Sequence, residues 1–370
     1  MKPLLLTNAV VVVTGATRGI GLATAQAFAT AGAIVYTGDL DAPTTPDNPT
    51  SLSNPPPHPT TAQSPDNTRA TPARPHPAPS PTDPRPDPPS PGTPSPHDAS
   101  SPHPGAFPDP TNYSPHPRAA SADPTALRPG THSTDCAEFS SGCIHGPWFL
   151  DVTSRDSFLS FVDNVIADSG RIDILVNNAG VMPLGRFLDE PDELSRTTLD
   201  VNVWGLIHGM RLVLPSMIAR GNGHVVNIAS MAGKIPFPGM AVYNASKYAA
   251  VGLTAAVRRE LHGTGVTASA VLPGAVRTSL SSGVRLGGLL PTVDPEDVAA
   301  AVLRTCRTQQ AELTVPRWLG GWKVLDGLVP ASAMALARRL AGDDRGLTVD
   351  DAARRAYNAR LATFSRTREA

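Results

Sequence analysis

Short apolar runs alternate with segments of helical periodicity along most of the chain, and this pattern predicts the secondary structure. The apolar runs are 9–13, 33–38, 148–152, 172–176, 223–228, 267–272 and 313–315, which are expected to be buried strands. Helical spacing is found in 22–31, after Ser154, in 192–219 as one or two pieces, and in 241–262 and 295–309. Strands that alternate with helices predict an α/β fold, a doubly wound parallel sheet with helices on both faces.

One long segment interrupts this pattern. Of the 40 prolines in the chain, 28 lie between residues 43 and 129, and Val, Ile, Met, Trp, Cys, Lys and Glu are absent from 43–130. Such a composition buries too little apolar surface to offset the entropy of ordering, so residues 43–133 are predicted to be a disordered Pro-rich insertion. A doubly wound fold normally places a helix here, and none is evident before residue 146.

Residues 1–42 and 146–316 are therefore expected to form a single α/β domain. Residues 317–370 are expected to form a C-terminal helical extension, with apolar positions at 334, 336, 337 and 340 at helical spacing. This extension would pack on the domain or on a partner subunit, or alternatively cap the substrate site or touch a membrane surface. The final 25 or so residues are polar and expected to fray.

Composition narrows the functional classes. A net charge of −1 gives no indication of a nucleic acid partner or an anionic membrane. Three cysteines are too few for a disulfide framework and favour a reducing, cytoplasmic location. No apolar run is long enough to span a membrane, and no spacing of His or Cys indicates a metal site.

A glycine-rich turn, Thr14-Gly15-Ala16-Thr17-Arg18-Gly19-Ile20-Gly21, joins the first predicted strand to the first helix. Glycines there allow close approach of the backbone, and the helix N-terminus attracts a phosphate. Asp39 follows 18 residues after Gly21, at the end of the second strand. A carboxylate in this place can accept both hydroxyls of an adenosine ribose, so this half of the chain predicts a dinucleotide site.

A second group of residues predicts acid–base chemistry. Tyr243 and Lys247 stand four residues apart on one predicted helix, which places both on the same face. A cation beside a phenol favours the phenolate, so the pair can act as a general base near neutral pH. Ser230 ends the preceding strand and can donate a hydrogen bond to the oxygen whose proton Tyr243 handles.

These motifs, in this order and spacing, resemble the short-chain dehydrogenase/reductase family of the common Tyr-x-x-x-Lys type over about residues 5–42 and 146–316. The resemblance implies a Rossmann-type sheet, a nicotinamide dinucleotide and a catalytic tetrad of Asn202, Ser230, Tyr243 and Lys247. The cofactor-binding residues that it implies are Gly15, Thr17, Arg18, Gly19, Ile20, Gly21, Asp39, Asp151, Val152, Asn178, Ala179, Gly180, Tyr243, Lys247, Pro273, Gly274, Val276 and Thr278.

Two residues bear on the choice of cofactor. Arg18 resembles the basic residue of many NADP-preferring members, whereas Asp39 would repel a 2′-phosphate. NAD is therefore favoured, with NADP as the alternative.

The expected substrate is a small hydrophobic secondary alcohol or ketone. Apolar stretches at 181–184, 231–240 and 279–290 would wall its site, and the substrate residues are expected to be Met182, Ser230, Met231, Met240 and Tyr243. Similar proteins form homodimers or homotetramers through the helices at 192–219 and 241–262. The rival interpretation is a non-catalytic dinucleotide-binding or interaction protein, disabled by the insertion beside Asp39.

Overall fold

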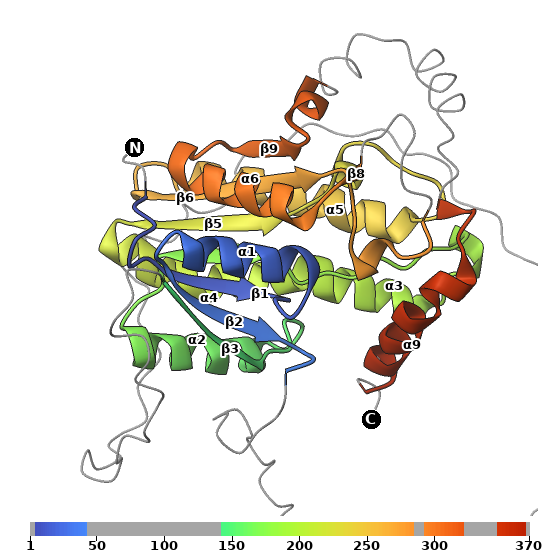
Figure 1. Ribbon diagram of the computed structural model, residues 1–370, viewed down its shortest axis with the longest axis horizontal. Coiled ribbons are helices and arrows are strands. Elements are labelled where there is room, and N and C mark those ends of the chain that lie inside the picture. Colours follow the sequence, from blue (N-terminus) through green and yellow to red (C-terminus); the bar gives the residue numbers. More distant parts are fainter. Residues whose placement is uncertain (1–3, 43–141, 285–291, 322–345, 368–370) are drawn as a thin grey trace, which may run out of the picture. The chain divides into compact units, whose positions relative to one another are not determined.

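Seven parallel strands form one sheet in the computed structural model, which describes residues 4–42, 142–284, 292–321 and 346–367 (Figure 1). Their order across the sheet is β3-β2-β1-β4-β5-β6-β9, which confirms the doubly wound prediction. A separate two-stranded pair joins β7 (Ala275–Val276) to β8 (Thr292–Val293). The seven strands of the main sheet are β1 (Val10–Thr14), β2 (Ile34–Asp39), β3 (Cys143–Phe149), β4 (Ile174–Asn177), β5 (Gly223–Ile228), β6 (Val266–Pro273) and β9 (Glu312–Val315).

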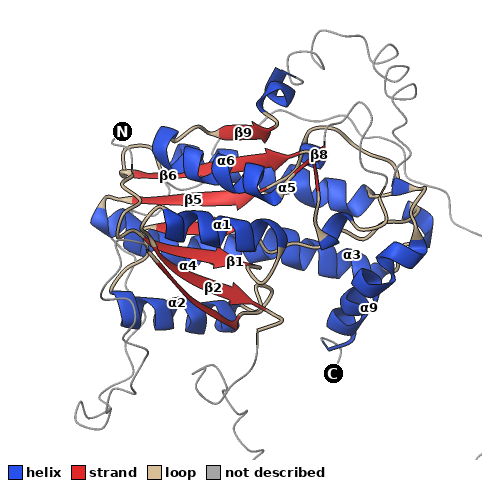
Figure 2. Cartoon of the chain, in the orientation of Figure 1, coloured by secondary structure: helices blue, strands red, loops and turns tan. Residues whose placement is uncertain are grey.

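Helices cover both faces of this sheet (Figures 1 and 2). One face carries α1 (Gly19–Thr30) and α6 (Pro295–Thr308), and the other carries α2 (Arg155–Ser169), α4 (Gly205–Arg220) and α5 (Ala241–Glu260). The predicted cap of α2 is present, since the Ser154 hydroxyl accepts from the Ser157 backbone N–H at 3.2 Å. Local signals thus set where these helices begin.

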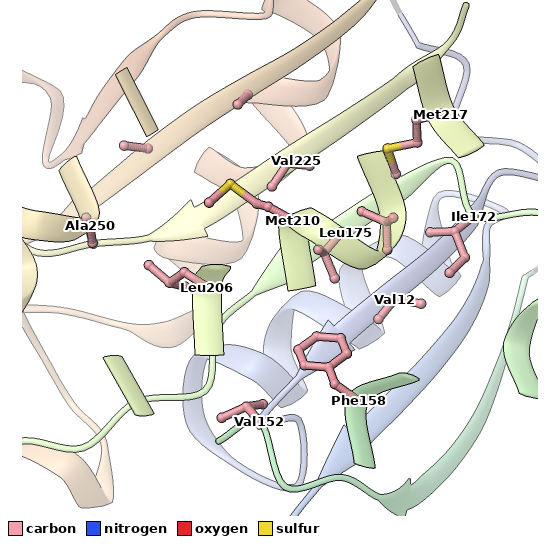
Figure 3. Packing of buried hydrophobic residues seen from close by; sticks show 14 of the residues in the cluster. Val12, Val152, Phe158, Ile172, Leu175, Leu206, Met210, Met217, Val225 and Ala250 are labelled. Carbon is pink, nitrogen blue, oxygen red and sulfur yellow. The ribbon is translucent and has the colours of Figure 1, made fainter. Parts of the chain in front are cut away.

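The two-residue period of the strands divides the core between the two faces. In β1, Val11 and Val13 pack with α1 and α6, whereas Val10 and Val12 pack with the helices behind. Figure 3 shows Phe158 of α2 and Met210 of α4 meeting Val12 and Leu175 of the sheet. Both faces of β1 are therefore buried, as its unbroken valine run predicts.

The sheet continues across the long insertion. β2 and β3 pair in parallel, from Ile34 opposite Cys143 to Asp39 opposite Phe149. The prediction of a strand at 148–152 was wrong at its start, because backbone pairing with β2 extends the strand over 143–147, where the sequence lacks an apolar run. The predicted disorder of 43–133 lies outside the described residues.

The predicted long helix is divided. α3 (Asp192–Leu199) and α4 flank one π-helical turn, Asp200–Trp204. In this turn the Asn202 side chain turns inward and is 1% exposed. Trp204 and Tyr248, on the helices expected to form a subunit interface, are 47% and 43% exposed, and the oligomeric state stays a prediction.

The C-terminal segment is ordered where fraying was expected. α9 (Asp351–Thr367) lies beside α3 near the carboxyl ends of the strands (Figure 1). Arg354, Tyr357 and Leu361 are buried, so tertiary contacts hold a helix that its polar composition does not predict. The apolar positions at 334–340 lie outside the described residues. None of the described helices is long and apolar enough to cross a membrane.

The packing of α2 yields a prediction. Phe158→Ala should lower the free energy of unfolding by about 3–5 kcal/mol, because it removes a ring with no exposed surface from between α2 and the sheet. Urea denaturation would measure this loss of stability. Asp163→Ala, at an exposed position of the same helix, should change the free energy of unfolding by less than about 0.5 kcal/mol. Equal effects of the two changes would contradict this packing.

Candidate active site

A cavity of about 380 Å³ opens at the carboxyl ends of the strands, the edge where doubly wound sheets bind ligands. It brings together nearly all of the residues singled out in the sequence. From that set, the lining comprises Gly15, Arg18, Gly19, Ile20, Asp39, Asp151, Val152, Asn178, Ala179, Gly180, Met182, Ser230, Met231, Met240, Tyr243, Lys247, Pro273, Gly274, Val276 and Thr278.

The glycine-rich turn is packed too closely for side chains. Gly15 has φ +64°, and a Cβ there would lie 2.8 Å from the Ala179 Cα. A Cβ on Gly21 would collide with the Gly15 carbonyl oxygen. At the N-terminus of α1, Arg18 makes no side-chain cap and the first turn holds no acid. The N–H groups of this turn are thus suited to an anionic ligand.

Asn178 ties this turn to the neighbouring strand. Its side-chain amide donates to the carbonyl oxygens of Thr14 and Gly15, both at 2.9 Å. In return, the Thr14 hydroxyl accepts from the backbone N–H groups of Asn178 and Ala179, both at 3.0 Å. These four bonds hold the ends of β1 and β4 together beneath the cavity.

Asp39 lies at the end of β2 and faces the glycine-rich turn. One of its carboxylate oxygens accepts from the Thr17 N–H at 2.9 Å and from the Thr17 hydroxyl at 2.7 Å. Arg18 is engaged by Asp41 in an ion pair, with both side chains partly exposed. Two acids therefore border this part of the cavity, and the Arg18 guanidinium is paired with the second of them.

Asp151 and Val152 border the same region from the end of β3. The Asp151 carboxylate accepts from the Thr153 N–H at 2.9 Å and from the Thr153 hydroxyl at 2.7 Å. The carboxylate is therefore turned toward the start of α2. Val152 is buried against Gly205.

Ser230, Tyr243 and Lys247 meet at the centre of the cavity. Ser230 follows β5, and its hydroxyl accepts from the Ala232 N–H at 3.1 Å. Lys247 lies one turn after Tyr243 on α5, with its ammonium 5.7 Å from the centre of the Tyr243 ring. The ammonium donates to the Ile228 carbonyl oxygen at 3.0 Å. All three side chains thus converge from two elements, as the spacing predicted.

Burial dominates the ionisation of this group. It raises the pKa of Tyr243 to about 12, although the Ser230 hydroxyl lowers it in part. Burial also lowers the pKa of Lys247 to about 8. The sequence predicted a Tyr243 pKa lowered by Lys247, and the structure has the opposite direction. The reason is that desolvation of the phenolate outweighs attraction to an ammonium that lies over the ring.

Asn202 stands behind the cavity wall. Its amide accepts from the Val181 N–H at 2.9 Å and donates to the Val181 carbonyl at 2.9 Å and the Ser246 hydroxyl at 3.0 Å. It therefore links the π-helical turn to the loop after β4 and to α5. Thr17, Gly21 and Asn202 are the only predicted site residues that the cavity lining, as the structure describes it, does not include.

Comparison with known proteins supports a family assignment. A family model described as short chain dehydrogenase matches residues 141–287. A dehydrogenase/reductase SDR family member 7B from Xenopus laevis is 33% identical over 205 residues, which cover 52% of this chain and 60% of that protein. These matches support the assignment of this chain to the short-chain dehydrogenase/reductase family.

Other relatives and solved structures agree with this assignment. An uncharacterized oxidoreductase from Staphylococcus saprophyticus is 38% identical over 133 residues, covering 35% of this chain and 54% of that protein. The probable oxidoreductase EphD from Mycobacterium tuberculosis is 34% identical over 191 residues, which cover 51% of this chain and 31% of that protein. The matched regions thus span about a third to about three fifths of these relatives.

Two crystal structures share the fold at low identity. A short-chain dehydrogenase/reductase from Burkholderia phymatum in complex with NAD has a TM-score of 0.54 and 18% identity, over 85% of this chain and 92% of that one. A metagenomic short-chain oxidoreductase in complex with NADP has a TM-score of 0.50 and 23% identity, over 84% of this chain and 98% of that one.

Several residues of the cavity lining escaped the sequence interpretation. Asp41 is one, although its place two residues after Asp39 was a usable signal. Four more lie in the C-terminal segment, where Gly346, Tyr357, Arg360 and Leu361 line the cavity. Buried positions of α9 recur at 354, 357 and 361, which is helical spacing, but an arginine among them conceals the pattern. The expected apolar wall is present, with Met182, Phe237, Met240, Leu280 and Val284 packed beside Tyr243.

The buried ammonium makes stability depend on pH. The pKa of Lys247 falls from 10.5 to about 8 on folding, so between these values the unfolded chain binds more protons. The free energy of unfolding of the wild type should therefore rise relative to that of Lys247→Met from about pH 8 to pH 10, by on the order of 3 kcal/mol. Denaturant titrations of both proteins at several pH values would measure the difference. Parallel profiles would show that Lys247 is solvated in solution.

Proposed function

We propose that this protein is an NAD-dependent oxidoreductase that interconverts a hydrophobic secondary alcohol and its ketone, with Tyr243 as general acid and base. The observation that carries the proposal is the convergence of Ser230, Tyr243 and Lys247 in one cavity with the glycine-rich turn. Residues from both sides of the insertion contribute to this cavity, which favours an intact site over the non-catalytic alternative.

The chain's residues fit a nicotinamide dinucleotide. The uncapped N-terminus of α1 and the close approach allowed by Gly15 and Gly21 suit its pyrophosphate. Asp39 would hold the adenosine ribose, Lys247 the other ribose, and Val276 and Thr278 the carboxamide. When bound, the nicotinamide supplies the hydride chemistry. The two solved structures that share this fold contain NADP and NAD, which supports the same class of cofactor here.

The polar side chains would then handle the substrate oxygen. In ketone reduction, Ser230 donates a hydrogen bond to the carbonyl oxygen, and the phenol of Tyr243 gives it a proton as hydride reaches the carbon. A Tyr243 pKa raised to about 12 keeps this phenol protonated at neutral pH. The ammonium of Lys247 stabilises the phenolate that remains. In alcohol oxidation, the same groups act in reverse, and the phenolate takes the hydroxyl proton.

The acids near Arg18 support NAD over NADP. A 2′-phosphate would meet the carboxylates of Asp39 and Asp41, and the Arg18 guanidinium that could bind it is already paired with Asp41. The two solved structures carry one cofactor each, so the preference rests on these residues alone. The apolar lining from Met182 to Val284 supports a hydrophobic substrate.

Replacement of the proposed acid tests the reaction. Tyr243→Phe should lower kcat/KM for a hydrophobic ketone by about 10²–10⁴-fold, because it removes the proton donor and keeps the ring. NADH affinity, measured by fluorescence titration, should stay within a few-fold of the wild type. A wild-type protein that binds NADH but converts no alcohol or ketone of a broad hydrophobic panel would favour the non-catalytic alternative.

Replacement of Asp41 tests the cofactor preference. The wild type should bind NADH at least about tenfold more tightly than NADPH, because each carboxylate repels the 2′-phosphate. Asp41→Asn should tighten NADPH binding by roughly three- to tenfold, since it also releases Arg18. Arg18→Ala in the Asp41→Asn background should reverse most of this gain. Glu260→Gln, the same charge change at the far end of α5, is the control and should change neither affinity. Stronger NADPH than NADH binding by the wild type would overturn the NAD assignment.

A further inference from the structure

Helix α9 forms one wall of the candidate active site. Tyr357, Arg360 and Leu361 line the cavity, and their spacing of three and four residues places them on one face of the helix. The buried Tyr357 also contributes to the raised pKa of Tyr243, which places the two phenols close together in the same cavity. A residue of the C-terminal extension therefore stands beside the proposed acid.

Arg354 fixes this helix to the rest of the site. The residue is 1% exposed, and its guanidinium donates to the carbonyl oxygens of Leu280 at 3.1 Å, Ser282 at 2.9 Å and Met182. These carbonyls belong to two loops, one after β7 and one after β4. Three charge-assisted bonds to two loops hold α9 in one position over the cavity.

The same contacts orient Tyr357. The guanidinium of Arg354 lies 4.5 Å from the centre of its ring, and the Met182 N–H donates to its hydroxyl at 2.7 Å. Burial raises the pKa of Tyr357, so the hydroxyl keeps its proton at neutral pH. Of the hydrogen bonds made between described residues, none has this hydroxyl as its donor. Its side chain is 8% exposed and borders the cavity, so the hydroxyl is available to donate to a ligand within the site.

We infer that Tyr357 is a specificity-determining residue whose hydroxyl donates a hydrogen bond to a second oxygen of the substrate, away from the reacting carbon. The reacting oxygen has its own partners in Ser230 and Tyr243. The hydroxyl of Tyr357 already accepts from Met182, so it selects a substrate acceptor rather than a donor. The wall there also contains the apolar side chains of Leu280, Met240 and Leu361, together with Arg360. This inference rests on the proposed function and narrows its substrate to hydrophobic ketones or alcohols that carry an additional ether, carbonyl or hydroxyl oxygen.

Matched ketones test this inference. The probes are a saturated bicyclic ketone and its analogues in which one ring CH₂ at successive positions is replaced by an ether oxygen, assayed at saturating NADH. The wild type should have a kcat/KM for at least one analogue that is roughly 3- to 10-fold higher than for the parent. The difference should lie mainly in a lower KM, because one added hydrogen bond to the substrate is worth about this factor in binding. Tyr357→Phe should abolish this preference, so that the ratio of kcat/KM for the analogue to kcat/KM for the parent falls to about one, whatever its activity on the parent ketone.

Arg354→Lys serves as the control for position alone. It weakens the contacts that orient Tyr357 but keeps its hydroxyl, so the preference for the analogue should shrink by less than in Tyr357→Phe. A preference that Tyr357→Phe retains, or a wild type with no preference for any analogue, would overturn the inference and leave the proposed function standing. The wild-type measurements on the parent ketone and its analogues can overturn the inference without any variant. The test therefore holds even if Tyr357→Phe folds poorly. Failure of the wild type to reduce any of these ketones while it binds NADH would instead overturn the proposed function, and this inference with it.

Discussion

The hydrogen bonds between the ends of β1 and β4 are the constraint on which the site depends. The Asn178 amide bonds the Thr14 and Gly15 carbonyls, and the Thr14 hydroxyl bonds two N–H groups in return. These strands are neighbours at the centre of the sheet, although more than 150 residues separate them in the chain. Their closure brings the glycine-rich turn against Ala179 and creates the crevice that a doubly wound sheet presents to ligands.

The long segment between β2 and β3 is compatible with this constraint because it interrupts a connection and not a strand. β2 and β3 still pair in register over most of their length. Each doubling of the length of a connecting loop adds only about 0.6 kcal/mol to the entropic cost of closing it. The core on both faces of β1 and β4 more than offsets such a cost.

Burial determines how the polar groups of the cavity ionise. Tyr243 and Lys247 both shift toward their neutral forms, since the cavity wall desolvates them more strongly than they stabilise each other. Arg354 is also buried, and its two terminal nitrogens donate to three carbonyl oxygens, whereas its Nε has no partner among the described residues. The cavity therefore holds a neutral phenol suited to proton donation, and a buried cation outside its lining fixes the helix that forms one wall.

The sequence by itself determined the parallel sheet, the helices and most of the site residues. Valine runs such as Val10–Val13, the spacing of Tyr243 and Lys247, and the Ser154 cap are local patterns, and local patterns report which face of an element is buried. The direction of the Tyr243 pKa, the pairing of Arg18 with Asp41, the start of β3 and the place of α9 were decided only by the tertiary structure. Each of these depends on a partner distant in sequence or on the loss of water around a group, and neither is encoded in spacing. Arg354 shows this most plainly, because an arginine predicts a solvent-exposed face until the carbonyls of Met182, Leu280 and Ser282 come together around it.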